Sequence, residues 1–249
     1  MFSYLKKNFF KIKVYLKKRK EISSFEESFI IFKSNLNSEF MMNSEDRVEY
    51  LFDATITTEY DRHYIYHTAW AARILEKTRP SKHIDISSSL FFCSMVSAFL
   101  PVEFFDFRPP NLKLSGLSVG SADLKKLLFE DNSIQSLSCM HVVEHIGLAR
   151  YGDELDYDGD LKAIRELKRV VASKGQLLFV VPIGKSIIQF NAHRIYKYAQ
   201  VLNMFSDFQL KEFALIPDDE NLGGLLTDAT EAMADQQNYG CGCFWFIKK

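Results

Sequence analysis

The chain has 249 residues, and 47% of them are hydrophobic, so it can bury a sizeable core and lacks the composition of a disordered protein. The net charge is only −1, but the first 20 residues hold eight bases and no acid, which leaves 23 bases against 32 acids in the rest. An acidic body of this kind is a poor match for a phosphate backbone, so we expect no nucleic acid partner.

Residues 1–20 predict a basic amphipathic helix. Its apolar residues recur at steps of three and four, and they are Phe2, Leu5, Phe9, Ile12 and Leu16. Such a helix either lies on the anionic inner face of a membrane or docks on its own domain or on a second subunit of a homo-oligomer. Because no apolar run predicts a membrane span and no export signal is visible, we expect a cytoplasmic protein with at most peripheral membrane contact.

Residues 21–80 predict a helical extension, because no glycine precedes Gly116 and no proline precedes Pro80. Within it, residues 61–77 place apolar side chains on one helical face, and Pro80 ends the pattern. The sequence therefore predicts three parts, over 1–20, 21–80 and 81–249.

From residue 81 onward, short apolar strands alternate with amphipathic helices. Strands are expected at 83–86, 102–107, 117–120, 133–140, 176–182, 210–216 and 241–248, and the main helices at 90–100, 161–171 and 195–205. This alternation predicts an α/β domain with a doubly wound, mostly parallel sheet that helices cover on both faces.

Acidic residues follow the first three of these strands. Asp85 lies at the end of the first, Asp106 at the end of the second 21 residues later, and Asp123 after the third. Ligands bind at the carboxyl edge of such a sheet, and an acid at this spacing is placed to accept hydrogen bonds from a ribose diol. An acidic rim suits an adenosine cofactor that carries a cationic sulfur and amine better than it suits a pyrophosphate.

The stretches HIDI-x-S, VEFFDF, SADLKKLLFEDNSIQSLSCMHVVEHI and LKAIRELKRVVASKGQLLFVVP resemble class I S-adenosylmethionine-dependent methyltransferases. The resemblance covers residues 82–249 in element order and is most specific over 122–182. It implies a Rossmann-like, seven-stranded methyltransferase fold, S-adenosylmethionine as cofactor, and cofactor contacts from Asp85, Ser87, Ser89, Asp106, Asp123 and Leu124. One departure is that Ser87 and Ser89 stand where the family has the glycines of D-x-G-x-G, which let the backbone approach the cofactor.

A narrower resemblance is carried by IGLARYGDELDYDGDLKAI, PIGKSIIQFNAHRIY and NYGCGCFWF. These stretches look like a subgroup of uncharacterised bacterial proteins with methyltransferase-like folds, often linked to surface-polysaccharide loci. With polysaccharide biosynthesis as the implied setting, we expect O-methylation of a sugar or glycan precursor. The alternative is a non-catalytic binding or assembly protein whose glycine-poor loop reflects lost cofactor binding.

His141, Glu144 and His145 have the spacing H-x-x-E-H, which on a helix places two metal-binding imidazoles beside a carboxylate. A zinc hydrolase is therefore a third hypothesis. However, a strand runs directly into His141, so the triplet falls on a strand-to-helix turn that disrupts the helical spacing. We expect no metal, and we predict that His141 is a general base near the transferred methyl group, with His193 as its rival.

Two loops are expected to bind the substrate. The loop RYGDELDYDGD supplies Tyr151 and Asp153, and the stretch QFNAHR supplies Asn191 and Arg194. On the last strand, Cys241-x-Cys243 places two thiols on one face, and we interpret them as core side chains rather than a metal pair.

Overall fold

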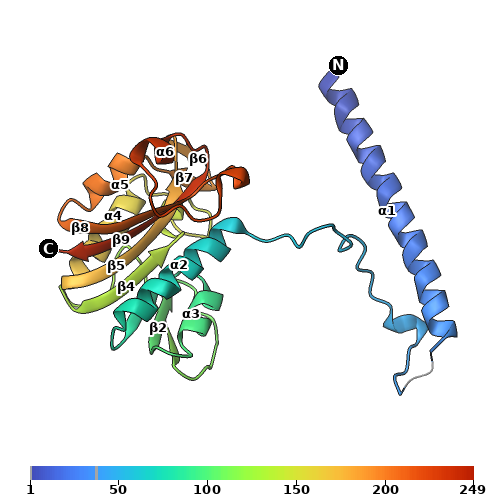
Figure 1. Cartoon of the computed structure of the whole chain (residues 1–249), viewed down its shortest axis with the longest axis horizontal. Helices are drawn as coiled ribbons and strands as arrows, with labels where there is room; N and C mark the ends of the chain where they lie inside the picture. The colour runs from blue at the N-terminus through green and yellow to red at the C-terminus, as the bar shows by residue number, and fades with distance from the viewer. Residues whose placement is uncertain (1, 37–38) are drawn as a thin grey trace. The chain divides into compact units, whose positions relative to one another are not determined.

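The structure is a computed structural model that describes the backbone of residues 2–36 and 39–249, and the side chains from residue 14 onward within those ranges. The chain divides into two compact units, one ending at Glu59 and one running from Tyr60 to Lys249. Figure 1 shows a long helix with its following segment in the first unit and a helix-covered sheet in the second. Among the described residues, no helix combines the length and the apolar character needed to cross a bilayer.

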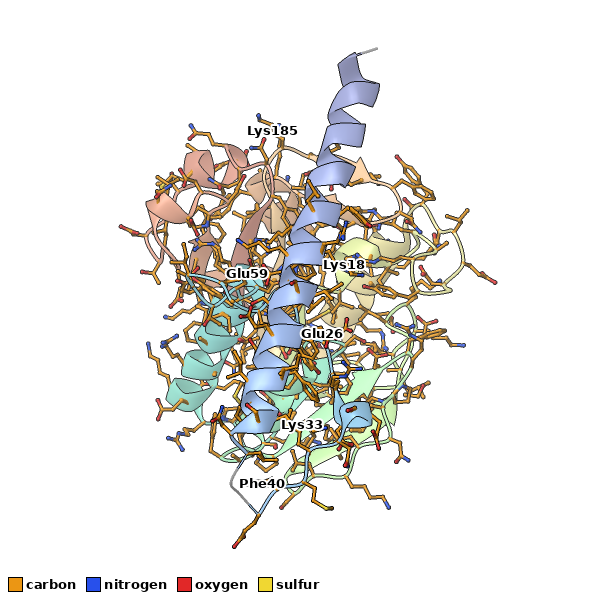
Figure 2. The ribbon with its side chains drawn as sticks, turned by 90° about the vertical axis from the view of Figure 1, so that its right-hand side faces the viewer. Lys18, Glu26, Lys33, Phe40, Glu59 and Lys185 are labelled. Carbon is orange, nitrogen blue, oxygen red and sulfur yellow. The ribbon has the colours of Figure 1, made fainter. Side chains whose placement is uncertain are left out.

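The first unit is built around α1 (Phe2–Ser34), followed by a single 3-10 turn, η1 (Ser44–Asp46). A helix is thus present over residues 2–20 of the expected 1–20, but it continues to Ser34 without a break at 20/21. Most of its expected apolar face lies outside the described side chains, and Leu16, which is described, is exposed. Lys18, Glu26 and Lys33 mark the second half of α1 in Figure 2.

The helical prediction for 21–80 is wrong over the described residues of 35–61, where η1 is the regular element. This segment is rich in Asn, Ser, Asp and Thr, whose side chains bond to the nearby backbone and compete with helix formation. The side chain of Asn35 donates to the carbonyl of Ile31 at 2.8 Å, and the hydroxyl of Thr55 donates to the carbonyl of Thr57 at 2.7 Å.

In the described part of the second unit, seven strands form one sheet in the spatial order β3-β2-β1-β4-β5-β9-β8. The strands are β1 (His83–Ile86), β2 (Val102–Asp106), β3 (Leu117–Ser121), β4 (Ile134–Met140), β5 (Val171–Ile183), β8 (Phe208–Ile216) and β9 (Gly240–Lys248). β9 runs antiparallel to its neighbours β5 and β8, and the pairs among β1 to β5 are parallel. The predicted doubly wound, mostly parallel sheet is confirmed.

Helices cover both faces of this sheet (Figure 1). They are α2 (Arg62–Thr78) and α3 (Leu90–Val96) on one face, and α4 (Gly159–Val170), α5 (Tyr198–Met204) and α6 (Glu231–Asp235) on the other. Along β5, Leu177 and Phe179 pack into the core of α4 and α5, whereas Leu178 and Val180 pack into the core of α2 and α3. This alternation with both faces apolar is what a buried parallel strand requires.

α2 belongs to the second unit, so the boundary lies at 59/60 rather than at the expected 80/81. Asp61 caps the helix by accepting a hydrogen bond from the N–H of Tyr64 at 3.2 Å. Trp70, Ile74 and Leu75 are buried in the core that α2 shares with α3 and β9. The break at Pro80 therefore ends a helix of the α/β domain and does not mark the edge of that domain.

Short elements complete the carboxyl edge of the sheet. After β4 comes a 3-10 turn, η2 (Val143–His145), and after β5 comes a hairpin of β6 (Ile187–Gln189) and β7 (His193–Ile195). A further 3-10 turn, η3 (Glu220–Leu222), lies between β8 and α6. Of the sequence-predicted site residues, His193 and Arg194 lie on one of these elements, β7.

Candidate functional site

The loop after β1 is held from beneath by Asp85, which is fully buried. Its carboxylate accepts hydrogen bonds from the N–H of Ser88 at 3.0 Å and from the hydroxyl of Ser138 on β4. Burial raises the pKa of Asp85 from 3.8 to about 6. Asp85 therefore shapes the loop but is not exposed at the ligand-binding edge, where a cofactor contact was expected.

Ser87 takes the left-handed backbone conformation that a glycine adopts most easily, with φ of 56°. Its hydroxyl donates to the carbonyl of Phe105 at 3.3 Å, and Ser89 caps α3 by accepting from the N–H of Phe92 at 3.5 Å. The loop thus retains a tight turn into a helix N-terminus, although serines stand at both glycine positions.

Asp106 and Asp123 lie at the ends of the adjacent strands β2 and β3, where Asp106 is half-buried and Asp123 is exposed. Each carboxylate accepts a hydrogen bond from the N–H two residues later, of Arg108 at 2.7 Å and of Lys125 at 2.8 Å. These local bonds fix the side chains at the edge. Leu124 instead packs into the core with α4, so it does not line the edge as expected.

Behind this edge, a buried polar network joins β1, β4 and β5. The ring of His83 bonds through Nδ1 to the hydroxyl of Ser136 and through Nε2 to that of Ser138, both at 2.8 Å. The Ser138 hydroxyl donates its proton to Asp85, so its oxygen accepts a hydrogen bond from the Nε2–H of His83. The Nδ1 of His83 then carries no proton and accepts from the Ser136 hydroxyl. Gln176 donates to Ser136 at 2.9 Å. We name these five residues the core network, and burial lowers the pKa of His83 to about 3, which keeps its ring neutral.

His141 follows β4 directly, with φ of 57° and with 8% of the residue exposed. Its Nδ1 lies 2.8 Å from Oε1 of Glu144, which is fully buried in η2. The second nitrogen of the ring, Nε2, and the second oxygen of Glu144, Oε2, are buried without a hydrogen-bond partner among the described residues. A carboxylate on one nitrogen orients an imidazole and stabilises its protonated form, which leaves Nε2 as the reactive atom.

His145 is engaged elsewhere. Its Nδ1 bonds to the carbonyl of Ala192 at 2.7 Å, and its Nε2 lies 3.8 Å from Glu144 Oε1. His141, Glu144 and His145 therefore do not converge as three ligands. This arrangement weakens the zinc-hydrolase hypothesis and agrees with a strand followed by a turn.

α2 brings three further aromatic side chains to His141. The ring centroids of His63, Tyr64 and His67 lie 5.3, 5.7 and 5.2 Å from that of His141. Burial, and then the nearby His141, lowers the pKa of His63 to about 4 and that of His67 well below its ordinary value. The sequence contained a signal for the two histidines, because His63-x-x-x-His67 places both on one face of a helix.

His193 on β7 and Tyr239, the residue before β9, extend this group of aromatic side chains. His193 stacks on Tyr239 with 4.7 Å between ring centroids, and Tyr239 stacks on His63 at 5.0 Å. Burial lowers the pKa of His193, whose Nε2 is also buried without a partner among the described residues. The two predicted bases, His141 and His193, thus lie in one aromatic group. We name His63, His67, His141, Glu144 and His193 the edge cluster.

Of the residues expected to bind substrate, Tyr151 and Asn191 are exposed. The guanidinium groups of Arg108 and Arg150 lie 5.1 and 5.0 Å from the Tyr151 ring centroid, which puts two positive charges beside this side chain. Tyr151 also meets the ring of His145 edge-on at 5.6 Å. Tyr151 therefore stands between the acidic strand ends and the histidines.

Asp153 and Arg194 are occupied within the protein. Asp153 accepts from the N–H of Gly147 at 2.7 Å and so folds the loop after η2. Arg194 is buried, donates to the carbonyl of Ile146 at 2.7 Å, and lies 3.5 Å from Asp160. Neither side chain is presented to a substrate, because local backbone and carboxylate groups take up their hydrogen bonds.

Comparison with known proteins gives a partial family match and a fold. A family described as "Caenorhabditis protein of unknown function, DUF268" matches residues 123–221. An uncharacterized protein of Methanocaldococcus jannaschii is 26% identical over 95 residues, which are 38% of this chain and 37% of that protein. The chain therefore spans little more than a third of the curated relative that it matches.

Several of the similar solved structures are described as methyltransferases. The N-methyltransferase NodS of Bradyrhizobium japonicum, solved with S-adenosylhomocysteine, has a TM-score of 0.54 at 12% identity, over 76% of this chain and 89% of that one. A putative sarcosine dimethylglycine methyltransferase of Galdieria sulphuraria has a TM-score of 0.52 at 11% identity, over 74% and 85%. At these identities the likeness shows the fold, and the predicted Rossmann-like methyltransferase fold is confirmed.

Proposed function

We propose that this protein is an S-adenosylmethionine-dependent methyltransferase that acts on a hydroxyl of a sugar or glycan precursor. The observation that carries the proposal is the order of side chains along one sheet edge. The Ser87 turn, Asp106 and Asp123 end β1, β2 and β3, and the His141–Glu144 pair follows β4. An imidazole of this kind suits the deprotonation of a hydroxyl, and similar solved structures include the N-methyltransferase NodS and a putative sarcosine dimethylglycine methyltransferase.

Asp106 and Asp123 would hold the adenosine end of the cofactor, and the turn from Ser87 to Ser89 the methionine end. The turn fits this task because Ser87 already has the left-handed conformation, and its hydroxyl is tied back to Phe105. S-adenosylmethionine supplies an electrophilic methyl group. The chain has to hold the acceptor oxygen in line with that group and to accept the proton of the acceptor.

Two side chains compete for the role of base. Both His141 Nε2 and His193 Nε2 are buried without a partner among the described residues, and burial lowers the pKa of His193 and so favours the neutral, proton-accepting ring. His141 has Glu144 to stabilise the proton it would gain. Tyr151 and Asn191 are the exposed side chains that we propose for acceptor binding.

Calorimetric titration with S-adenosylhomocysteine tests the cofactor. The full chain should bind it, and Asp106→Asn should weaken binding about tenfold to hundredfold, because charge-assisted hydrogen bonds contribute about 1.5–3 kcal/mol each. Glu130→Gln changes an exposed acid at the opposite edge, before β4, and should bind like the parent. Absence of binding at millimolar concentration would overturn the proposal.

A non-catalytic binding protein on this fold is the second candidate. The observation that favours it is the pair of serines at glycine positions, together with an Asp85 that is fully buried. This candidate predicts no cofactor binding by the parent, and it is tested further by restoring the glycines in Ser87→Gly with Ser89→Gly. Binding that appears only in that double variant would identify a fold that has lost its cofactor.

We further propose that residues 1–20 contact the anionic cytoplasmic surface of a membrane. The support is the eight basic residues on a helix, with exposed Val14, Tyr15 and Leu16 in its described part. Sedimentation with anionic and with neutral vesicles tests the proposal. The full chain should sediment with the anionic vesicles, and the chain without residues 1–20 should not. Equal sedimentation of both proteins would overturn the proposal of membrane contact.

A further inference from the structure

Three potential metal ligands from distant parts of the chain meet at the edge cluster. His63 comes from α2, His141 follows β4, and Cys241 comes from β9. One ligand atom from each lies within 4.8 Å of the others. His141 and Cys241 are buried, and His63 is half-buried. Because no two of these residues share an element, sequence spacing gave no sign of the group.

Both imidazoles are anchored through a second contact, as metal-binding histidines are. His141 Nδ1 is held by Glu144, and the ring of His63 makes a backbone hydrogen bond with Tyr239. In metal sites, a carboxylate or backbone carbonyl on one ring nitrogen directs the other nitrogen to the ion. The free nitrogen of His141, Nε2, is buried without a partner among the described residues, so it lacks the bond that such an atom ordinarily makes.

We propose that His63, His141 and Cys241 bind one divalent metal ion of the zinc type. Two imidazoles and one thiolate suit zinc better than they suit magnesium or calcium, which prefer oxygen. Tetrahedral zinc holds such ligand atoms roughly 3.3–3.6 Å apart, so separations within 4.8 Å close by small side-chain rotations. The thiol proton of Cys241 leaves to solvent as the sulfur binds.

Three protein ligands leave a fourth position on a tetrahedral ion. His63 is the half-buried member of the group, so this position faces the open side, where water or a hydroxyl can enter. The bound ion takes up His141 Nε2, so this atom no longer accepts a proton. Under the proposed methyl transfer, the proton of the acceptor then passes to His193. Metal binding itself does not depend on that function.

The neighbouring cysteine provides a matched control. Cys243 is equally buried on the same face of β9, with its sulfur 4.0 Å from that of Cys241. It is not a member of the three-residue group within the described chain. Cys241→Ala and Cys243→Ala therefore make the same chemical change at two buried sites of one strand, but only Cys241→Ala removes a predicted metal ligand.

The test uses the full chain after treatment with a chelator, with added Zn²⁺ for stoichiometry and Co²⁺ for spectroscopy. We expect one ion per chain and a thiolate-to-cobalt charge-transfer band. Cys241→Ala should lose this band, and His63→Gln should weaken binding at least tenfold. Cys243→Ala should retain both the band and the stoichiometry.

Circular dichroism identifies variants that fail to fold, and the His63 variant, at a half-buried position, keeps the test available if Cys241→Ala unfolds. Parent protein that binds less than one ion at a tenfold excess of metal, or that shows no charge-transfer band, overturns the proposal. So does a band that survives in folded Cys241→Ala. Calorimetry with S-adenosylhomocysteine on the metal-free chain tests the methyltransferase proposal independently, so the failure of one proposal can be told from the failure of the other.

Discussion

Two groups of buried polar side chains flank β4, and they differ in how completely they are satisfied. In the core network, His83 uses both ring nitrogens and Asp85 uses both carboxylate oxygens within the protein. In the edge cluster, four side-chain atoms are buried without a partner among the described residues, and they belong to His67, His141, Glu144 and His193. Both groups contain histidine and one carboxylate, so the kinds of residue do not separate them.

The difference in partners indicates a difference in role. A buried polar atom without a hydrogen bond costs free energy, so a fold retains one chiefly where something else binds it. The core network therefore fixes β1 against β4 and β5, whereas the edge cluster is the group at which we propose that a ligand binds. Variants in the first group should alter stability, and variants in the second should alter binding.

Asp85→Asn gives the largest expected effect, which depends on pH. Because the pKa of Asp85 is about 6 in the folded state and 3.8 when exposed, the folded protein binds this proton more tightly. Its stabilising effect is complete below pH 3.8 and is lost as the pH rises through 6. Between pH 7 and pH 4, the parent should therefore gain about 2 kcal/mol of unfolding free energy relative to Asp85→Asn.

Urea unfolding followed by tryptophan fluorescence measures this difference, since both tryptophans, Trp70 and Trp245, lie in the α/β unit. The subtraction removes the titration of all other groups. A difference between the two proteins that does not vary with pH would show that Asp85 is hydrated rather than buried in the core network.

Ser138→Ala should lower the unfolding free energy by about 2 kcal/mol at pH 7, because it removes a partner from both His83 and Asp85. Metal binding should be unchanged. Ser94→Ala removes a hydroxyl at a half-buried position outside the network and should cost less than about 0.5 kcal/mol. Equal losses of unfolding free energy in the two variants, by the same urea measurement, would show that the hydrogen bonds of the core network add no stability beyond that of an ordinary hydroxyl.

Glu144→Gln should have the converse effect. It should lower metal affinity about tenfold to hundredfold, because it weakens the anchor of His141. Competition with a chromogenic chelator measures the affinity, and thermal unfolding of the metal-free protein reports stability. A variant that unfolds more easily but binds metal like the parent would place Glu144 with the structural residues.

Ser87→Gly has the smallest expected effect, a gain of up to about 1 kcal/mol in unfolding free energy. Ser87 has φ of 56°, which glycine adopts without steric cost, although the bond to Phe105 is lost. Ser89→Gly at φ of −99° removes the cap of α3 and should destabilise instead. Changes of the same sign in both variants would show that the loop is not strained at Ser87.

The alternation of apolar strands and helices predicted the sheet well, because both patterns depend on neighbours a few residues apart. β2, β4 and β8 lie where the period-two and apolar runs placed them. The helical prediction is wrong over the described residues of 35–61, because the sequence lacks glycine and proline there but its polar side chains bond to the local backbone. Of the residues predicted for the site, Asp106 and Asp123 lie at the ends of their strands, whereas Asp85 and Leu124 are buried.

By itself, the sequence determined the α/β class, the order of the elements and the presence of acids and a histidine at successive strand ends. Tertiary structure alone decided which of these side chains are buried and which lie close together. Arg194 is buried and donates to the backbone carbonyl of Ile146, whereas His63 and Cys241 lie beside His141 although they come from elements far apart in the chain. The physical reason is that secondary structure follows local periodicity, whereas the burial and the hydrogen-bond partners of a polar side chain depend on segments that only folding brings together.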